Sequence, residues 1–155
     1  TSRSAGYRII FTAKTGRSRS YLVRFQIMKT EDQVASEIVD AAIAVHRALG
    51  PGLLESAYEA CLAYELRNRG LDVEQQKVQP IRYGDLLIDA GYRLDLLVEN
   101  KVIVELKALE LVLPVHHAQI ITYLKLSGIS VGFLINFNVS LMKNGIRRFV
   151  NNFKS

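Results

Sequence analysis

Two stretches of the chain place apolar residues three and four positions apart, the spacing of one face of an α-helix. The first stretch predicts an amphipathic helix over residues 31–49, with apolar positions at Val34, Ile38, Ala41, Val45 and Ala48. Gly50-Pro51-Gly52 then breaks the pattern, and we expect a second helix over residues 53–69. A third helix is expected over residues 115–127, where Gly128 ends it.

Other segments are rich in β-branched and apolar residues and predict strands over residues 72–83, 86–98, 102–108, 131–136 and 146–150. Pro80 and Gly84 interrupt the first two, which indicates an edge strand or a bend. The order of two helices, a meander of strands, a helix and further strands indicates an α/β or α+β fold. We therefore expect a single domain in which helices cover a mixed β-sheet.

The composition is that of an ordinary globular domain, with 155 residues of which 49% are hydrophobic and 23% are charged. No apolar stretch approaches the roughly 18 residues that a membrane-spanning helix needs, and no signal peptide is recognisable. The single cysteine, Cys61, excludes an internal disulfide and a multi-cysteine zinc site. We expect a cytoplasmic protein with no membrane partner.

The net charge of +5 belongs to the start of the chain. Residues 1–29 hold seven of the twenty Lys and Arg residues and no acid, which leaves thirteen basic residues against all fifteen acidic ones in the remainder, a net charge of −2. We divide the chain into a basic extension, residues 1–29, and a folded domain, residues 30–155. The extension is expected to be poorly ordered, or to be sequence upstream of a natural start at Met28.

Residues 102–108 contain two charges in an otherwise apolar run. Glu105 and Lys107 are two positions apart, so their side chains project from the same face of the predicted strand. Burying a carboxylate and an ammonium group costs several kcal/mol unless each finds a partner, a metal ion or water. These two residues are therefore candidates for a functional site.

The length of the loop around Asn100 decides which residues face Glu105. A three-residue loop, 99–101, places Asp95 opposite Glu105 and Arg93 opposite Lys107, with opposed side chains on one face. A two-residue loop would instead pair Asp95 with Leu106 and turn the two carboxylates to opposite faces. The sequence permits both registers, and we favour the first.

Two adjacent carboxylates repel each other, and a divalent cation relieves that repulsion. Mg²⁺ prefers hard oxygen ligands, typically one or two carboxylates, and leaves room for a substrate phosphate. A lysine two residues further on can stabilise a developing negative charge. Asp95, Glu105 and Lys107 therefore have the parts for hydrolysis of a phosphodiester bond with Mg²⁺ or Mn²⁺ as cofactor.

Three motifs, taken together, resemble a known family. Asp95 followed by Glu105-Leu106-Lys107 resembles the signature of the PD-(D/E)XK nuclease superfamily, with Leu94 in place of the proline that precedes the aspartate in its name. Gly52-Leu53-Leu54-Glu55-Ser56-Ala57-Tyr58 resembles the motif of the GxxExxY protein family, a prokaryotic branch of that superfamily. Gln119-Ile120-Ile121-Thr122-Tyr123 resembles the Q-x-x-x-Y helix motif of RecB-like members. The resemblance implies a restriction-endonuclease-like fold over roughly residues 30–150.

The resemblance also implies roles for the central residues. It makes Asp95 and Glu105 metal ligands, with the backbone carbonyl of Leu106 as a third. It makes Lys107 the residue that orients or deprotonates the attacking water. Glu55 matches the helical acid that completes many such sites, as a ligand or through a bridging water. Its other interpretation is a solvated helix glutamate.

The same resemblance suggests substrate contacts. Gln119 and Tyr123 are one helical turn apart and would border the site, in contact with Lys107 or with substrate, although periodicity alone places Tyr123 in the core. Tyr58 follows Glu55 by three residues and can share its face. The alternative interpretation of Tyr58 is a core tyrosine with a bonded hydroxyl.

Three further ionisable residues lie close to these motifs in the predicted fold. His116 shares a face with Gln119 and is a candidate site residue, whereas we expect His117 to be exposed. Arg93 could contact phosphate, because a like-charged pair with Lys107 is unfavourable without an anion nearby.

The predicted function is a Mg²⁺- or Mn²⁺-dependent nuclease that acts on DNA or RNA, with DNA as the favoured partner. The alternative is a non-catalytic nucleic-acid-binding or protein-interaction module that keeps the fold, which the net charge of −2 outside the basic extension favours. A homodimer or another protein partner is also plausible for a domain of this size.

Overall fold

A computed structural model of the protein describes residues 28–152. The chain divides into two units, Thr1–Thr30 and Glu31–Ser155, and the fold below is that of the second unit. The predicted basic extension, residues 1–29, lies almost wholly outside the described residues, so its order and its origin stay predictions. Across residues 28–152, no helix combines the length and the hydropathy that a membrane-spanning helix needs.

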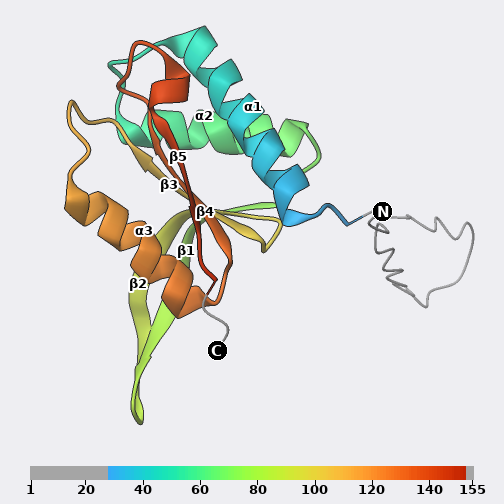
Figure 1. Ribbon diagram of the computed structural model, residues 1–155. Coiled ribbons are helices and arrows are strands. Elements are labelled where there is room, and N and C mark those ends of the chain that lie inside the picture. Colours follow the sequence, from blue (N-terminus) through green and yellow to red (C-terminus); the bar gives the residue numbers. More distant parts are fainter. Residues whose placement is uncertain (1–27, 153–155) are drawn as a thin grey trace, which may run out of the picture. The chain divides into compact units, whose positions relative to one another are not determined.

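The fold is a five-stranded mixed sheet covered by helices on both faces, as predicted (Figure 1). The helices are α1 (Glu31–Leu49), α2 (Glu55–Asn68) and α3 (Pro114–Ser127), with a short 3₁₀ helix, η1 (Met142–Asn144). The strands are β1 (Val73–Tyr83), β2 (Leu86–Val98), β3 (Val102–Lys107), β4 (Val131–Asn136) and β5 (Ile146–Val150). These bounds confirm the predicted helices and strands to within two residues, and only η1 was not foreseen.

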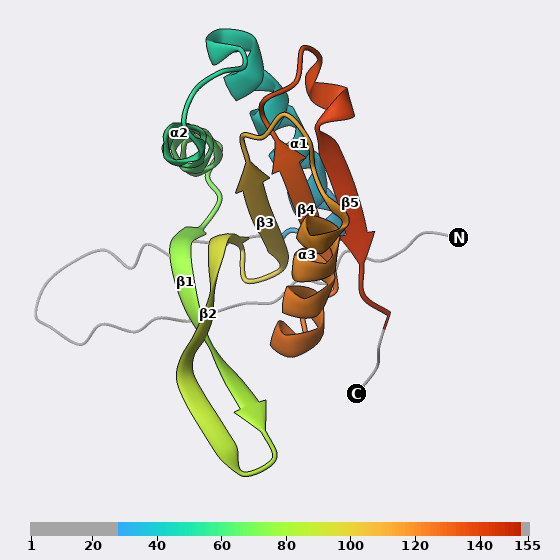
Figure 2. The same cartoon turned by 90° about the vertical axis from the view of Figure 1, so that its left-hand side faces the viewer.

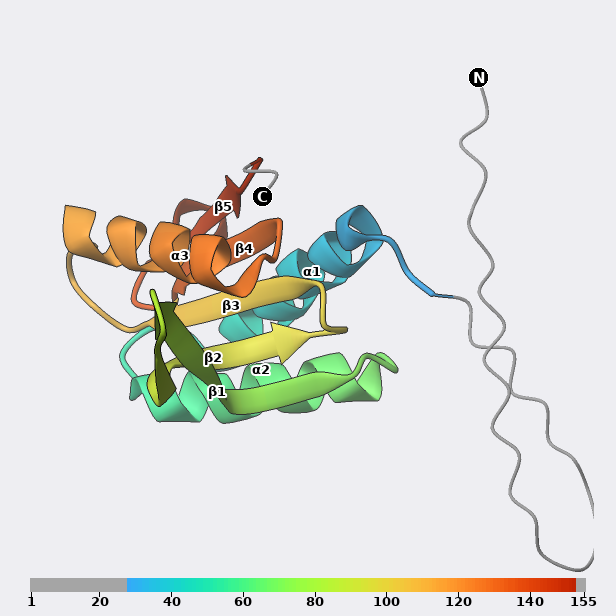
Figure 3. The same ribbon diagram turned by 90° about the horizontal axis from the view of Figure 1, so that it is seen from below.

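The strands lie in the order β1-β2-β3-β4-β5. All neighbouring pairs are antiparallel except β3 and β4, which are parallel. Parallel strands need a crossover, and α3 supplies it. Viewed from below, α3 lies on the opposite side of the sheet from α2 (Figure 3).

Strands β3 and β4 are buried on both faces, which explains their continuous apolar sequence. Val104 and Leu106 of β3 belong to the large core under α1 and α2. Ile103 belongs to the smaller core under α3, with Ile120 and Leu124 of that helix. Because side chains alternate along a strand, Glu105 and Lys107 share the α3 face with Ile103.

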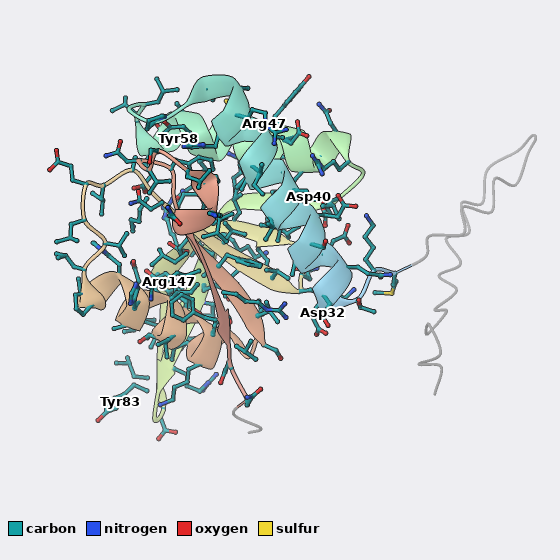
Figure 4. The ribbon with its side chains drawn as sticks, turned by 45° about the horizontal axis from the view of Figure 1, so that its top comes forward. Asp32, Asp40, Arg47, Tyr58, Tyr83 and Arg147 are labelled. Carbon is teal, nitrogen blue, oxygen red and sulfur yellow. The ribbon has the colours of Figure 1, made fainter. Side chains whose placement is uncertain are left out.

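The hairpin of β1 and β2 runs beyond the rest of the sheet (Figure 2). We call residues 79–92 the arm. The ladder shifts register between Gln79 and Ile81, at Pro80, and β1 is an edge strand, so the edge-strand interpretation is confirmed. The arm exposes large apolar side chains, among which Tyr83 is 81% exposed and Leu86 is 57% exposed. Figure 4 labels Tyr83 near the tip.

The close approach of β4 to the segment before β5 gives a test of the fold. A Cβ atom added at Gly145 would overlap the backbone oxygen of Asn136. We expect Gly145→Ala to lower the free energy of unfolding by about 1–3 kcal/mol, because the backbone must move to admit the methyl group. Denaturant unfolding measures the loss. Lys143→Ala, two residues earlier and exposed, should stay within about 0.5 kcal/mol of the wild type. An unchanged midpoint for Gly145→Ala would contradict the described packing.

Candidate active site

The loop between β2 and β3 has three residues, as the favoured register requires. Val98 pairs with Val102, Leu97 with Ile103 and Leu96 with Val104. Two non-glycine residues of the loop, Glu99 and Asn100, have φ angles of 54° and 53°. Asp95 and Glu105 come next in this register. The predicted hairpin register is therefore confirmed.

The carboxylates of Asp95 and Glu105 replace the hydrogen bonds of the ladder where it ends. The backbone N–H of Asp95 donates to Oε1 of Glu105 at 3.1 Å. The backbone N–H of Leu106 donates to Oδ2 of Asp95 at 2.9 Å. Each carboxylate thus bonds to the opposite strand, and the two acids lie together at the end of the hairpin.

Burial sets the protonation of Glu105. This residue is 3% exposed. Loss of hydration, and next the nearby negative charge of Asp95, raise the pKa of Glu105 to about 9, while the positive charge of Lys107 acts in the opposite direction. Unless a metal ion binds beside it, an acid with this pKa holds a proton at neutral pH.

Glu55 reaches the same group of charges from α2. It is the first residue of that helix and is half-buried. Burial raises the pKa of Glu55, the Lys107 charge lowers it, and the charges of Asp95 and Glu59 raise it. The structure therefore brings Glu55, Asp95, Glu105 and Lys107 into one electrostatic cluster. Within residues 28–152, Lys107 forms no direct ion pair.

Tyr58 fixes the turn that precedes Glu55. Its hydroxyl donates to the carbonyl of Gly50 at 2.6 Å and accepts the backbone N–H of Leu53 at 3.1 Å. The side chain is 0% exposed, and its ring stacks on Phe137 with centroids 4.5 Å apart. This placement favours the core interpretation of Tyr58 over direct contact with substrate. Figure 4 labels Tyr58 among the helices at one end of the fold.

Gln76 of β1 is a neighbour of Asp95 that the sequence did not indicate. Its side-chain amide donates to Oε2 of Glu59 at 2.8 Å and to Oδ1 of Asp95 at 3.3 Å. Its φ angle of 51° is unusual for a residue other than glycine. Nothing in the sequence marks this backbone conformation, because it arises where β1 and β2 turn away from the sheet.

The predicted pairing of Arg93 with Lys107 is wrong. Arg93 is exposed and pairs with Val78 of β1, and the ladder between β2 and β3 stops at Leu96 and Val104. The physical reason is that β2 follows β1 into the arm and leaves β3 beyond Asp95. The argument that a like-charged pair demands an anion near Arg93 therefore falls away.

Gln119 and Tyr123 bond to each other. The Gln119 amide donates to the Tyr123 hydroxyl at 2.8 Å, and the Tyr123 ring stacks on Tyr92 of β2 with centroids 4.6 Å apart. Neither side chain hydrogen-bonds Lys107 within the described part of the chain. Burial raises the pKa of Tyr92, and its buried hydroxyl has no hydrogen-bond partner among residues 28–152. Tyr123 packs against the α3-side core, as its periodicity predicts.

The structure places the two histidines at the start of α3, where His116 stays a candidate site residue. Nδ1 of His116 accepts the backbone N–H of Leu113 at 2.9 Å, which caps the start of α3. His117, expected to be exposed, is half-buried and its ring lies 5.7 Å from that of Phe149 on β5. The prediction for His117 is wrong because periodicity within α3 carries no information about β5.

The donors at the acidic pair are suited to a hard divalent cation. Asp95 and Glu105 offer carboxylate oxygens only, and a cation would replace the proton that burial places on Glu105. In the described residues, no three side chains of Asp, Glu, His or Cys are grouped closely enough to form a metal site by themselves. Of the predicted side-chain ligands, Asp95 and Glu105 are therefore the two that hydrogen bonds bring together across the hairpin.

Comparison with protein-family models identifies the superfamily of the chain. The model of the PD-(D/E)XK nuclease superfamily matches residues 32–149, so the chain belongs to that superfamily. Membership supports a nuclease function, implies binding of nucleic acid, and fits the general use of divalent metal ions by these enzymes. Neither a curated protein nor a solved structure gives a significant match.

Removing the Tyr58 hydroxyl tests the turn before Glu55. We expect Tyr58→Phe to lower the free energy of unfolding by about 1–3 kcal/mol, because the Gly50 carbonyl and the Leu53 N–H both lose a partner. Chemical denaturation measures this loss. The ring stack on Phe137 stays, so the variant should fold. Tyr64→Phe is the matched control, because the Tyr64 side chain is 67% exposed. Equal stability of the Tyr58 variant and the control would contradict the role of the hydroxyl.

The raised pKa of Glu105 predicts how stability changes with pH. Between its ordinary value of 4.5 and about 9, the folded protein holds a proton that the unfolded chain releases. In metal-free buffer the free energy of unfolding should therefore fall as pH rises through this range, by up to about 1.4 kcal/mol per unit for one proton. Glu105→Gln removes this contribution.

The measurement is the difference in unfolding free energy between Glu105→Gln and the wild type from pH 5 to pH 9, with a chelator present. The variant should gain on the wild type as pH rises. Asp89→Asn, an exposed acid on the arm, controls for general loss of charge. A constant difference across the range would show that Glu105 ionises normally.

Proposed function

We propose that the protein is a Mg²⁺- or Mn²⁺-dependent nuclease that hydrolyses phosphodiester bonds of DNA or RNA, with DNA as the favoured substrate. One observation carries the proposal. The carboxylates of Asp95 and Glu105 each accept a backbone N–H from the opposite strand of the hairpin, and Lys107 lies on the same face of β3 as Glu105. Glu105 is buried and Asp95 is half-buried, and a buried acid is costly to keep without a function. Superfamily membership supports the same conclusion.

The proposal places the chain in the GxxExxY branch. The structure gives each named position of that motif a physical role. Gly52 has a φ angle of 99°, which favours glycine, Glu55 joins the charge cluster, and Tyr58 holds the intervening turn. The motif therefore works as one unit that presents a carboxylate at the start of α2.

Each residue of the candidate site has a separate role in the proposed reaction. Asp95, Glu105 and the carbonyl of Leu106 would hold the metal ion, which when bound would neutralise charge on the phosphate. Lys107, free of ion pairs within residues 28–152, orients the attacking water and stabilises negative charge that builds up on the phosphoryl oxygens. Water attacks phosphorus and releases a proton to solvent, the bond to the leaving oxygen breaks with its electron pair on that oxygen, and the leaving oxygen takes up a proton from solvent. Glu55 acts through water at the edge of the group.

A second candidate is a non-catalytic module that retains the nuclease fold and binds nucleic acid or protein. The net charge of −2 outside residues 1–29 favours it, because binding to a phosphate backbone normally uses several cations. Such a module would not need Lys107 beside two acids. A homodimer or a protein partner, and a cytoplasmic location, stay predictions of the sequence.

Replacing Lys107 separates the two candidates. With Mn²⁺, the wild type should nick supercoiled plasmid DNA or cut a labelled oligonucleotide, and Lys107→Ala should be slower by about 100-fold or more, because charge stabilisation is lost. Lys101→Ala, in the loop that precedes the same strand, is the matched control and should keep its activity. DNA, RNA and branched substrates are tested in parallel. Equal activity of wild type and Lys107→Ala would point to a contaminant and would remove the enzymatic proposal.

A metal titration tests the ligand assignment apart from catalysis. Calorimetry with Mn²⁺ should detect binding to the wild type and at least about tenfold weaker binding to Asp95→Asn, because an amide is a poorer ligand than a carboxylate. The amide oxygen can still accept the Leu106 N–H, so the variant should fold. Asp89→Asn should bind like the wild type. Identical binding by all three proteins would exclude Asp95 as a ligand.

A further inference from the structure

A hollow of about 230 Å³ opens on the α3 face of the sheet, over β4 and the segment that leads into β5. Its walls come from the loop before α3, from α3 itself, from β4 and from the segment that leads into β5. The residues that line it are Leu111, Val112, His117, Leu134, Asn136, Asn144, Gly145 and Arg147. We call this hollow the α3–β5 pocket.

The pocket is next to the candidate site in the register of the sheet. Leu134 and Asn136 of β4, which line the pocket, are the direct partners of Glu105 and Lys107 on β3. Leu134 pairs in turn with Arg147 on β5. Neighbouring strands lie about 4.8 Å apart, so the Arg147 and Glu105 backbones are separated by about 10 Å.

All these side chains lie on one face. An added Cβ on Gly132 would meet Ile120 and Leu124 of α3, so Gly132 and the residues that alternate with it on β4 face that helix. On β5, Phe149 contacts the His117 ring of α3, and Arg147 shares the face of Phe149. Figure 4 labels Arg147 beside α3 and Asp32 near the start of α1.

The pocket offers hydrogen-bond donors with no acid to oppose them. Among residues 28–152, the side chains of His117, Asn144 and Arg147 make no hydrogen bond or ion pair with another residue. The fourth polar residue, Asn136, is fully engaged, because its side-chain amide bonds to both the N–H and the carbonyl of Leu109. No Asp or Glu lines the pocket. A guanidinium, an imidazole and an amide in this arrangement match the oxygens of a phosphate.

We propose that the α3–β5 pocket binds a backbone phosphate of the nucleic-acid strand whose neighbouring phosphate lies at Asp95 and Glu105. This inference rests on the proposed function, and it gives the strand a direction across the sheet, from β3 over β4 to β5. Arg147 makes the principal contact, and His117 and Asn144 support it. His117 lies in the first turn of α3, at the positive end of the helix dipole, which adds to the attraction.

Arg148 provides a control of matched charge. It follows Arg147 directly on β5, but its side chain bonds to Asp32 of α1 at 2.7 Å, on the other face of the sheet. Arg147→Ala and Arg148→Ala therefore remove the same charge from adjacent positions. Any difference between the two variants reports on the pocket and not on net charge.

The experiment measures binding of a fluorescein-labelled single-stranded DNA of about 20 nucleotides by anisotropy, with a chelator present so that no cleavage occurs. Arg147→Ala should bind about tenfold more weakly than the wild type, as loss of one charge-assisted contact implies, and Arg148→Ala should stay within about twofold. The dependence of log affinity on log salt concentration should fall by about one for Arg147→Ala. His117→Ala and Asn144→Ala should show smaller losses. Thermal unfolding confirms that each variant is folded.

Several results would overturn the proposal: equal weakening by both arginine variants, wild-type affinity in Arg147→Ala, or no binding of DNA by the wild type. Binding of inorganic phosphate alone, as tight as that of the oligonucleotide, would show a site for free anions and would also overturn it. The nicking assay is read separately. If the nicking assay removes the nuclease proposal but Arg147→Ala still binds DNA more weakly than Arg148→Ala, the pocket proposal stands. Normal nicking with no such difference would remove the pocket alone.

Discussion

The reciprocal hydrogen bonds of Asp95 and Glu105 determine the arrangement of the candidate site. Each carboxylate accepts a backbone N–H from the opposite strand, at the point where the ladder between β2 and β3 ends. The acids therefore serve the backbone and, in the proposed function, would also form the ligand pair. The cost of burying the Glu105 carboxylate appears as its raised pKa. A bound cation would offset this cost by taking the place of the proton.

The other groups are positioned around this pair by separate elements. Tyr58 and the turn that it holds bring Glu55 from α2, and the alternation of β3 brings Lys107 to the α3 face. The parallel pairing of β3 with β4 then places Leu134 and Asn136 beside them. Because α3 is the crossover between these two strands, the α3–β5 pocket and the acidic pair are built on one face by one connection.

Most of the fold was predictable because it follows from local signals. Periodicity and the glycines near positions 50, 70 and 128 set the helices. The sequence permitted two registers around Asn100, and the structure has the favoured one, in which a three-residue loop brings Asp95 to Glu105. Failures occurred where the outcome depends on distant packing. Arg93 does not face Lys107, because β2 leaves β3, and His117 is half-buried, because β5 lies against it. Gln76 adopts a backbone conformation for which its residue type gives no signal.

The arm lies beside the site but differs from it in local stability. A hairpin of two strands is marginal on its own, and residues 80 and 82–90 are exposed, whereas β3 and β4 are buried on both faces. We therefore expect the amide hydrogens of the arm to exchange first and those of β3 and β4 to exchange last. Asp95 lies at the boundary between these two regions. Its carboxylate accepts the N–H of Leu106 on the side expected to exchange slowly. Asp95, the proposed metal ligand, therefore keeps its orientation when the arm opens locally.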